Sequence, residues 1–235
     1  MWWGIVLVII CVLLLLCFLL AVANFSGERF MEKYEEVNKQ YPNNNLTPLA
    51  FISHLNKLYF NNKLQVVQIS EVAKDCYAKG KLFLSTQTLR NPSYASFTII
   101  AHEIGHAFQD KTGKKLKKLN RLRKIGRLVG TLLTPSIIAG VVLMILGHNL
   151  FYWGVAVASF GVFIFILALI IKLRTISIEK DASKNAIKFL KEFFDENDLK
   201  KCKSFLNDAR LTYWADFLKI CLGWTTMSRK TKLFN

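Results

Sequence analysis

Two histidines and a glutamate form an HExxH pattern inside an apolar stretch of the chain. From Phe97 the sequence reads FTIIAHEIGHAFQD, so His102 and His106 are four residues apart and Glu103 stands between them. On an α-helix this spacing places both imidazoles on one face, where they can bind the same metal ion. The Glu103 carboxylate would then face a water molecule activated by the metal, in the position of a general base. The pattern predicts a zinc site with hydrolytic chemistry.

The residues around the motif predict the helix that the two imidazoles need. Asn91-Pro92-Ser93 is a start signal, and Lys111-Thr112-Gly113 is a stop signal. The alternative is a chance match in a buried helix. Burying an ionisable side chain costs several kcal/mol of folding free energy unless the group is paired or bound to a metal. Three such groups within one turn therefore favour a metal site over chance.

A catalytic zinc site needs a third protein ligand, and the chain offers few histidines for that role. Besides the motif pair they are His54 and His148. His148 lies in the short connection between two apolar runs, residues 128–146 and 151–171. If both runs cross a bilayer, this connection lies on the opposite side from the motif helix. His54 lies on an earlier predicted helix and stays a candidate, although nothing in the sequence locates it near the motif.

Carboxylates that follow the second of these apolar runs are better placed. The segment reads RTISIEKDASKNAIKFL and contains Glu179 and Asp181. Because a hairpin of two spans returns the chain to the side it left, this segment is expected next to the motif helix. Glu179 shares a helix face with Ile176, Ser183 and Ala186, and that face is expected to pack inward. Glu179 is therefore the favoured third ligand, and Asp181 is a weaker candidate.

Long apolar runs predict an integral membrane protein. Residues 2–23 carry no charge and can cross about 30 Å of hydrocarbon as a helix. Ala21-Val22-Ala23 resembles a signal-peptide cleavage site, but the length of the run and the lack of a preceding Lys or Arg favour an uncleaved anchor. Residues 128–146 and 151–171 predict two further spans in a tight hairpin. The amphipathic residues 211–227 predict a fourth span or an interfacial helix.

Composition and charge agree with a membrane protein that has basic flanks. The chain is 52% hydrophobic and still carries a formal charge of +16. Residues 111–127 hold nine Lys or Arg and no acidic residue. Such a cluster beside a span marks the cytoplasmic side and attracts anionic lipid headgroups, and we do not expect nucleic-acid binding. The chain is therefore expected in the cell membrane, with its N-terminus outside and its catalytic segments in the cytoplasm.

The predicted fold is mainly α, with three or four transmembrane helices and a small α+β, zincin-like portion that carries the motif helix. The chain divides into an N-terminal anchor (1–23), a cytoplasmic catalytic segment (24–127), a transmembrane hairpin (128–171) and a C-terminal helical segment (172–235). The five cysteines show no CxxC spacing, so no disulfide framework is predicted.

Two helices and two strands are predicted ahead of the motif. The helices cover residues 24–40 and, after the Thr47-Pro48 cap signal, the residues up to about Phe60. The strands cover 64–69 and 81–85, with a turn around residues 78 to 80 between them. The second strand is either an edge strand that pairs with an extended substrate or an ordinary structural strand.

Several stretches together resemble one known family. HEIGHAFQ, the hairpin after a basic segment, ExDAS, the later LTY and the upstream DCYAKGKLFLS are similar to the YugP-type neutral zinc metallopeptidases, which are bacterial integral-membrane proteins. The resemblance covers most of the chain. It implies a membrane-embedded gluzincin with one catalytic Zn²⁺, held by His102, His106 and Glu179, and with Glu103 as the base.

Three further residues take their interpretation from such resemblances. EKDASKNA is more distantly similar to the ExxADxxA segment of HtpX-like and prenyl-protein-processing peptidases, but Ser183 stands where those proteins have Asp. Asp181 is then the carboxylate that could hydrogen-bond a zinc ligand. Tyr213, in the LTY stretch, could donate a hydrogen bond to a developing oxyanion, although an aromatic residue of the membrane interface is the simpler interpretation.

The sequence as a whole predicts zinc-dependent hydrolysis of a peptide or membrane-protein substrate at the cytoplasmic membrane face. Two alternatives come from other classes of protein. One is a metal-binding membrane protein without turnover, and the other is a polybasic lipid-binding anchor. Glu103 argues against the first, because a purely structural metal site has no use for that carboxylate. No recognisable pattern indicates the oligomeric state or selects a particular substrate.

Overall fold

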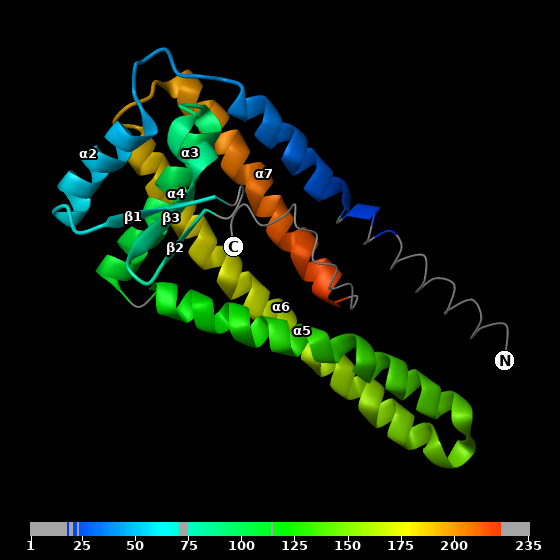
Figure 1. Cartoon of the computed structure of the whole chain (residues 1–235). Coiled ribbons are helices and arrows are strands. Elements are labelled where there is room, and N and C mark those ends of the chain that lie inside the picture. Colours follow the sequence, from blue (N-terminus) through cyan, green and yellow to red (C-terminus); the bar gives the residue numbers. More distant parts are fainter. Residues whose placement is uncertain (1–17, 19–20, 23, 71–74, 114, 222–235) are drawn as a thin grey trace. The chain divides into compact units, whose positions relative to one another are not determined.

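The computed structural model describes residues 18, 21–22, 24–70, 75–113 and 115–221, and it is mainly helical with one small sheet (Figure 1). The chain divides into two compact units. The sheet unit contains Gly27–Leu119 and Ile176–Thr212. The hairpin unit contains Asn120–Thr175 and the described residues before Gly27 and after Thr212. The predicted span over residues 2–23 lies almost entirely outside the described residues.

Helices of the sheet unit begin at the cap signals that the sequence contains. Thr47 caps α2 (Pro48–Phe60), and its side chain accepts a hydrogen bond from a backbone N–H of the first turn. Ser93 caps α4 (Tyr94–Thr112) in the same way, and α4 ends at Gly113. The predicted helices before and at the motif are thereby confirmed, and residues 24–38 are helical as well.

Three strands form the sheet in the order β1-β3-β2. β1 (Gln65–Ile69) runs parallel to β3 (Lys81–Ser85), and β2 (Cys76–Ala78) pairs antiparallel with β3 through a turn at Lys79 and Gly80, both with positive φ. β3 is the central strand, so its interpretation as an edge strand that pairs with substrate is wrong. It is an ordinary structural strand, which was the alternative interpretation. β2 was not predicted, because three residues are too few to show a strand period.

α4 lies in the core of the sheet unit, and almost every side chain on it is buried. Phe97 packs edge-on against Phe51 of α2 and against Phe194, with ring centroids 5.5 and 5.3 Å apart. The short helix α3 (Thr86–Arg90), which was not predicted, leads from β3 to α4. Because α4 is buried from Tyr94 to Ala107, an ionisable group within that stretch needs a compensating interaction.

One continuous helix carries both the second apolar run and the polar segment after it. α6 extends over His148–Leu190, a length of 43 residues. Within the sheet unit α6 approaches α4 closely, since a Cβ added at Gly105 would lie 2.5 Å from the carbonyl oxygen of Ala182. Only a glycine permits this approach. Gly105 therefore sets the separation of the two helices at the motif.

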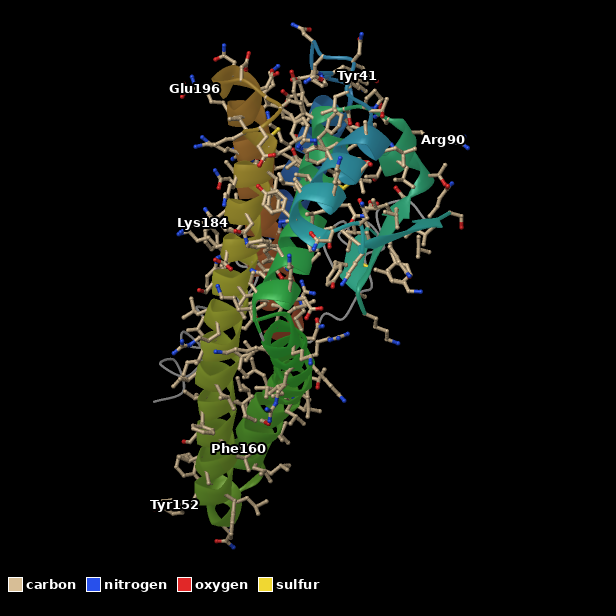
Figure 2. All side chains as sticks on the ribbon, turned by 90° about the vertical axis from the view of Figure 1, so that its left-hand side faces the viewer. Tyr41, Arg90, Tyr152, Phe160, Lys184 and Glu196 are labelled. Carbon is tan, nitrogen blue, oxygen red and sulfur yellow. The ribbon has the colours of Figure 1, made fainter. Side chains whose placement is uncertain are left out.

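Two helices of the hairpin unit are long and apolar enough to cross a membrane. α5 (Lys115–Leu146) and α6 run antiparallel beside each other and are connected at Gly147 (Figure 1). Most of their apolar side chains are exposed, and Figure 2 shows Tyr152 and Phe160 among them on the outside of α6. The hairpin predicted from the sequence is present. The basic residues 111–127, which the sequence suggested as a linker ahead of the hairpin, are mostly helical instead, because α5 already begins at Lys115.

The last described helix belongs partly to each unit. α7 (Glu196–Cys221) begins well before residue 211, and in the hairpin unit its Trp214 and Phe217 pack with Leu133. Among the described residues only α5 and α6 have the length and composition of membrane spans, so a fourth span at 211–227 finds no support in that part of the chain. Residues 222–227 lie outside the described residues.

The contact between α4 and α6 predicts the effect of Gly105→Ala. The added methyl group would meet the Ala182 backbone, so the helices must separate, and we expect a loss of roughly 1–3 kcal/mol in unfolding free energy. Thermal unfolding of detergent-purified protein measures the loss. Gly113→Ala is the matched control, because its methyl group meets no atom within 4 Å. Equal unfolding midpoints for the two variants would contradict the close packing.

Candidate metal centre

Three buried side chains of the sheet unit converge on one point. Nε2 of His102 lies 3.5 Å from Oε2 of Glu179, and Nε2 of His106 lies 3.3 Å from the same oxygen. Within the described part of the chain they form a group whose ligand atoms all lie within 4.8 Å of one another. A tetrahedral ion with bonds of about 2.1 Å holds its ligand atoms about 3.4 Å apart. Two imidazole nitrogens and one carboxylate oxygen thus fit zinc in chemical type and in spacing.

Two helices supply the members of this group. The spacing on α4 places the two imidazoles on one face, with ring centroids 4.8 Å apart. α6 supplies Glu179 three residues before Ala182, the residue that contacts Gly105. Because the glycine lets the helices approach, the Glu179 side chain reaches both imidazoles. The structure brings together the three residues expected to bind zinc, and their binding of the ion stays a prediction.

Glu103 is buried beside this group and is held by the sheet. Its Oε2 accepts a hydrogen bond of 2.7 Å from the backbone N–H of Tyr77 in β2. The Tyr77 hydroxyl donates another, of 3.0 Å, to Asp110 on α4. Burial raises the pKa of Glu103 above its ordinary value, while the two imidazoles and the Tyr77 N–H act against that rise. The carboxyl group is therefore oriented and also easier to protonate than an exposed glutamate.

In each imidazole, Nδ1 is the ring nitrogen that does not face Glu179, and it also has a contact. Nδ1 of His106 lies 3.0 Å from Oε1 of Gln109, and Nδ1 of His102 lies 3.3 Å from the Ser183 hydroxyl. The Gln109 amide donates to the backbone carbonyl of Ile178 and to a carboxylate oxygen on α6, each at 2.9 Å. Such contacts orient an imidazole so that its remaining nitrogen faces the ion.

Asp181, the weaker candidate for third ligand, lies outside the converging group. Its Oδ2 accepts hydrogen bonds from Gln109 at 2.9 Å and from Lys115 Nζ at 3.0 Å. Partial burial raises the pKa of Asp181, but these two hydrogen bonds and the charge of Lys115 outweigh burial and leave the pKa below its ordinary value. In the described structure Asp181 reaches His106 through Gln109, and Ser183 makes the direct contact with a motif histidine.

Three candidates from the sequence remain: His54, His148 and Tyr213. His54 is more than half exposed on α2, and its Nε2 lies 3.7 Å from a carboxylate oxygen of Glu192. The side chain of His148 is not among those that the structure describes. Tyr213 belongs to the hairpin unit, where the ammonium group of Lys172 lies 5.5 Å from the centre of its ring. Its role toward an oxyanion stays a prediction.

Two residues of the site were not predicted from the sequence. Gln109 follows His106 by three residues, so helical spacing alone could have identified it as a neighbour of that imidazole. Tyr77 contributes its backbone N–H to Glu103, and every residue except proline has such a group. No side-chain pattern could therefore have identified Tyr77.

Comparison with known proteins identifies the family. No curated protein and no solved structure matches the chain. The family model described as "Putative neutral zinc metallopeptidase" matches residues 6–227, which include both motif histidines, Glu103 and Glu179. The match covers nearly the whole chain, and the buried group of two imidazoles and one carboxylate has the ligand types of a catalytic zinc site. The chain therefore belongs to this family.

Proposed function

We propose that this protein is a membrane-embedded zinc endopeptidase, with His102, His106 and Glu179 as zinc ligands and Glu103 as general base. The observation that carries the proposal is the convergence of the three ligand atoms from α4 and α6. Membership of the family supports the reaction class. Zinc with this set of ligands keeps a position for water or substrate, acidifies the water and polarises the scissile carbonyl.

Glu103 moves the protons of the proposed reaction. It accepts a proton from the attacking water and then delivers it to the nitrogen of the leaving amine as the peptide bond breaks. The hydrogen bond from the Tyr77 N–H to Oε2 fixes the orientation of the carboxylate.

The burial of Glu103 also favours a peptidase over a metal-binding protein without turnover. A structural zinc site gains nothing from a further buried carboxylate, and the burial costs folding free energy. A polybasic lipid anchor would have no use for the buried group of two histidines and a glutamate. Hydrolysis gives a role to all four buried groups.

Two helices of the hairpin unit support the location in the membrane. α5 and α6 have the length and composition of spans, and the basic residues before position 128 suit the anionic headgroups of a cytoplasmic leaflet. We therefore place the connection at Gly147 outside the cell, and the motif helix and Glu179 on the cytoplasmic side. The substrate is then a peptide or a membrane-protein segment that reaches this face.

The orientation can be measured with Asn149→Cys in intact cells. A membrane-impermeant thiol reagent should label this variant from outside, because residue 149 lies in the first turn of α6, next to the connection at Gly147. The unmodified chain is the control for its own five cysteines. Labelling only after permeabilisation of the cells would reverse the proposed topology.

The proposed chemistry can be tested with Glu103→Gln and His102→Ala. Glu103→Gln should bind zinc but lose roughly 10²–10⁴-fold in peptide hydrolysis, because the amide cannot accept the proton. His102→Ala should lose both zinc and hydrolysis. Metal content and the cleavage of a peptide library by detergent-purified protein give the two readouts. Hydrolysis at the wild-type rate by Glu103→Gln protein would eliminate this mechanism.

The third ligand can be tested with Glu179→Ala. Loss of the carboxylate leaves two imidazoles, so elemental analysis should find about one zinc per chain in the wild type and little in the variant. Glu192→Ala is the matched control, since Glu192 is a carboxylate just after the end of α6 that contacts Tyr59 and His54 instead of the imidazoles of the motif. Full zinc occupancy in Glu179→Ala protein would exclude Glu179 as a ligand.

A further inference from the structure

We propose that Gln109 is a positioning residue that sets the zinc affinity of the site by fixing the tautomer of His106, and that Asp181 holds the Gln109 amide in the required orientation. This inference rests on the proposed function, because it assumes that His106 binds the ion through Nε2. It assigns roles to two polar side chains that the proposed reaction does not use. Gln109 itself is almost fully buried.

The orientation of the Gln109 amide follows from the chemistry of its neighbours. One end of the amide faces the backbone carbonyl of Ile178 and Oδ2 of Asp181, each at 2.9 Å. Both neighbours are acceptors, so this end must be the NH₂ group, which has two hydrogens to donate. The reverse orientation would place three acceptors against one another in a buried site. Oε1 must therefore be the end that faces His106.

This orientation selects one form of the His106 ring. Oε1 of Gln109 lies 3.0 Å from Nδ1 and can only accept, so Nδ1 must carry the proton. A neutral imidazole that is protonated on Nδ1 has its lone pair on Nε2, and Nε2 faces Glu179 at 3.3 Å. In the other tautomer Nε2 would donate a hydrogen bond to Glu179 and could not bind a cation. Gln109 disfavours that tautomer.

The two imidazoles differ in this respect. His102 faces the Ser183 hydroxyl at 3.3 Å, and a hydroxyl can either donate or accept, so Ser183 does not select a tautomer. Gln109 has a second effect as well, because it binds the carbonyl of the residue next to Glu179. One side chain therefore orients a ligand on α4 and anchors the α6 segment that carries the third ligand. We expect the site to depend more on Gln109 than on Ser183.

Gln109→Met is the primary test, because methionine keeps the approximate volume and removes both the donor and the acceptor. The zinc Kd is measured by chelator competition on detergent-purified, metal-free protein. The variant should bind zinc about 10–100-fold more weakly. Without metal the variant should lose some stability, because methionine leaves the Ile178 carbonyl without its donor, but it should still unfold in one cooperative transition, which excludes a general loss of packing. Gln68→Met is the matched control: it makes the same change on β1, where Gln68 contacts Thr86, and should leave the zinc Kd unchanged.

Exchange of the donor and the acceptor tests the role of Asp181. Gln109→Glu alone would set a carboxylate against Asp181 and the Ile178 carbonyl, and should weaken zinc binding. In the double variant Gln109→Glu/Asp181→Asn the new amide at position 181 can donate to the new carboxylate at position 109, which still accepts from His106. The double variant should therefore bind zinc more tightly than the Gln109→Glu single variant. A further loss in the double variant would overturn the role of Asp181.

The outcomes separate this inference from the proposed function. A zinc Kd for Gln109→Met within about twofold of the wild type, or a loss no larger than that of Ser183→Ala, overturns the inference while the peptidase proposal stands. Zinc binding without peptide hydrolysis in the wild type overturns the peptidase proposal, and a weaker Kd in Gln109→Met protein still supports the inference. A wild-type protein that binds no zinc overturns both.

Discussion

The burial of four ionisable side chains around one point is the constraint on which the structure depends. His102, His106, Glu103 and Glu179 are all almost inaccessible to water. Burying one such group alone costs a large part of the roughly 5–15 kcal/mol by which a domain is stable. The four groups are compatible with a stable fold only together, where imidazoles and carboxylates compensate one another or share a cation. The close contact of α4 with α6 makes that compensation possible, and it depends on a glycine in the motif.

Different elements hold the base and the ligands. The sheet holds Glu103, through a backbone N–H of β2 that every substitution at Tyr77 except proline retains. Side chains hold the imidazoles: Gln109 contacts one ring and Ser183 contacts the other. A disturbance at the sheet would therefore act first on proton transfer, whereas a disturbance between α4 and α6 would act first on metal binding. The two properties can be separated by mutation for this reason.

The length of α6 adds a second constraint. One uninterrupted helix of 43 residues contains both an apolar run long enough for a membrane and the proposed third ligand. Because successive residues of a helix are rotated by about 100°, a shift of one residue in its register would turn Glu179 away from the imidazoles. The register of α6 against α4 is therefore part of the site, and the contact between Ala182 and Gly105 fixes it.

Local patterns in the sequence determined the motif helix, its caps and the apolar hairpin, because helical spacing and hydropathy are properties of neighbouring residues. The preference for Glu179 over Asp181 came from the helix face on which Glu179 lies, and its role as a ligand stays a prediction. Even that choice needed the hairpin argument to bring two distant segments together. The tertiary structure alone decided that β3 is central, that Gln109 lies between His106 and Asp181, and that a strand of three residues holds the base through its backbone. These features depend on distances between segments far apart in the chain, and periodicity within one segment does not encode such distances.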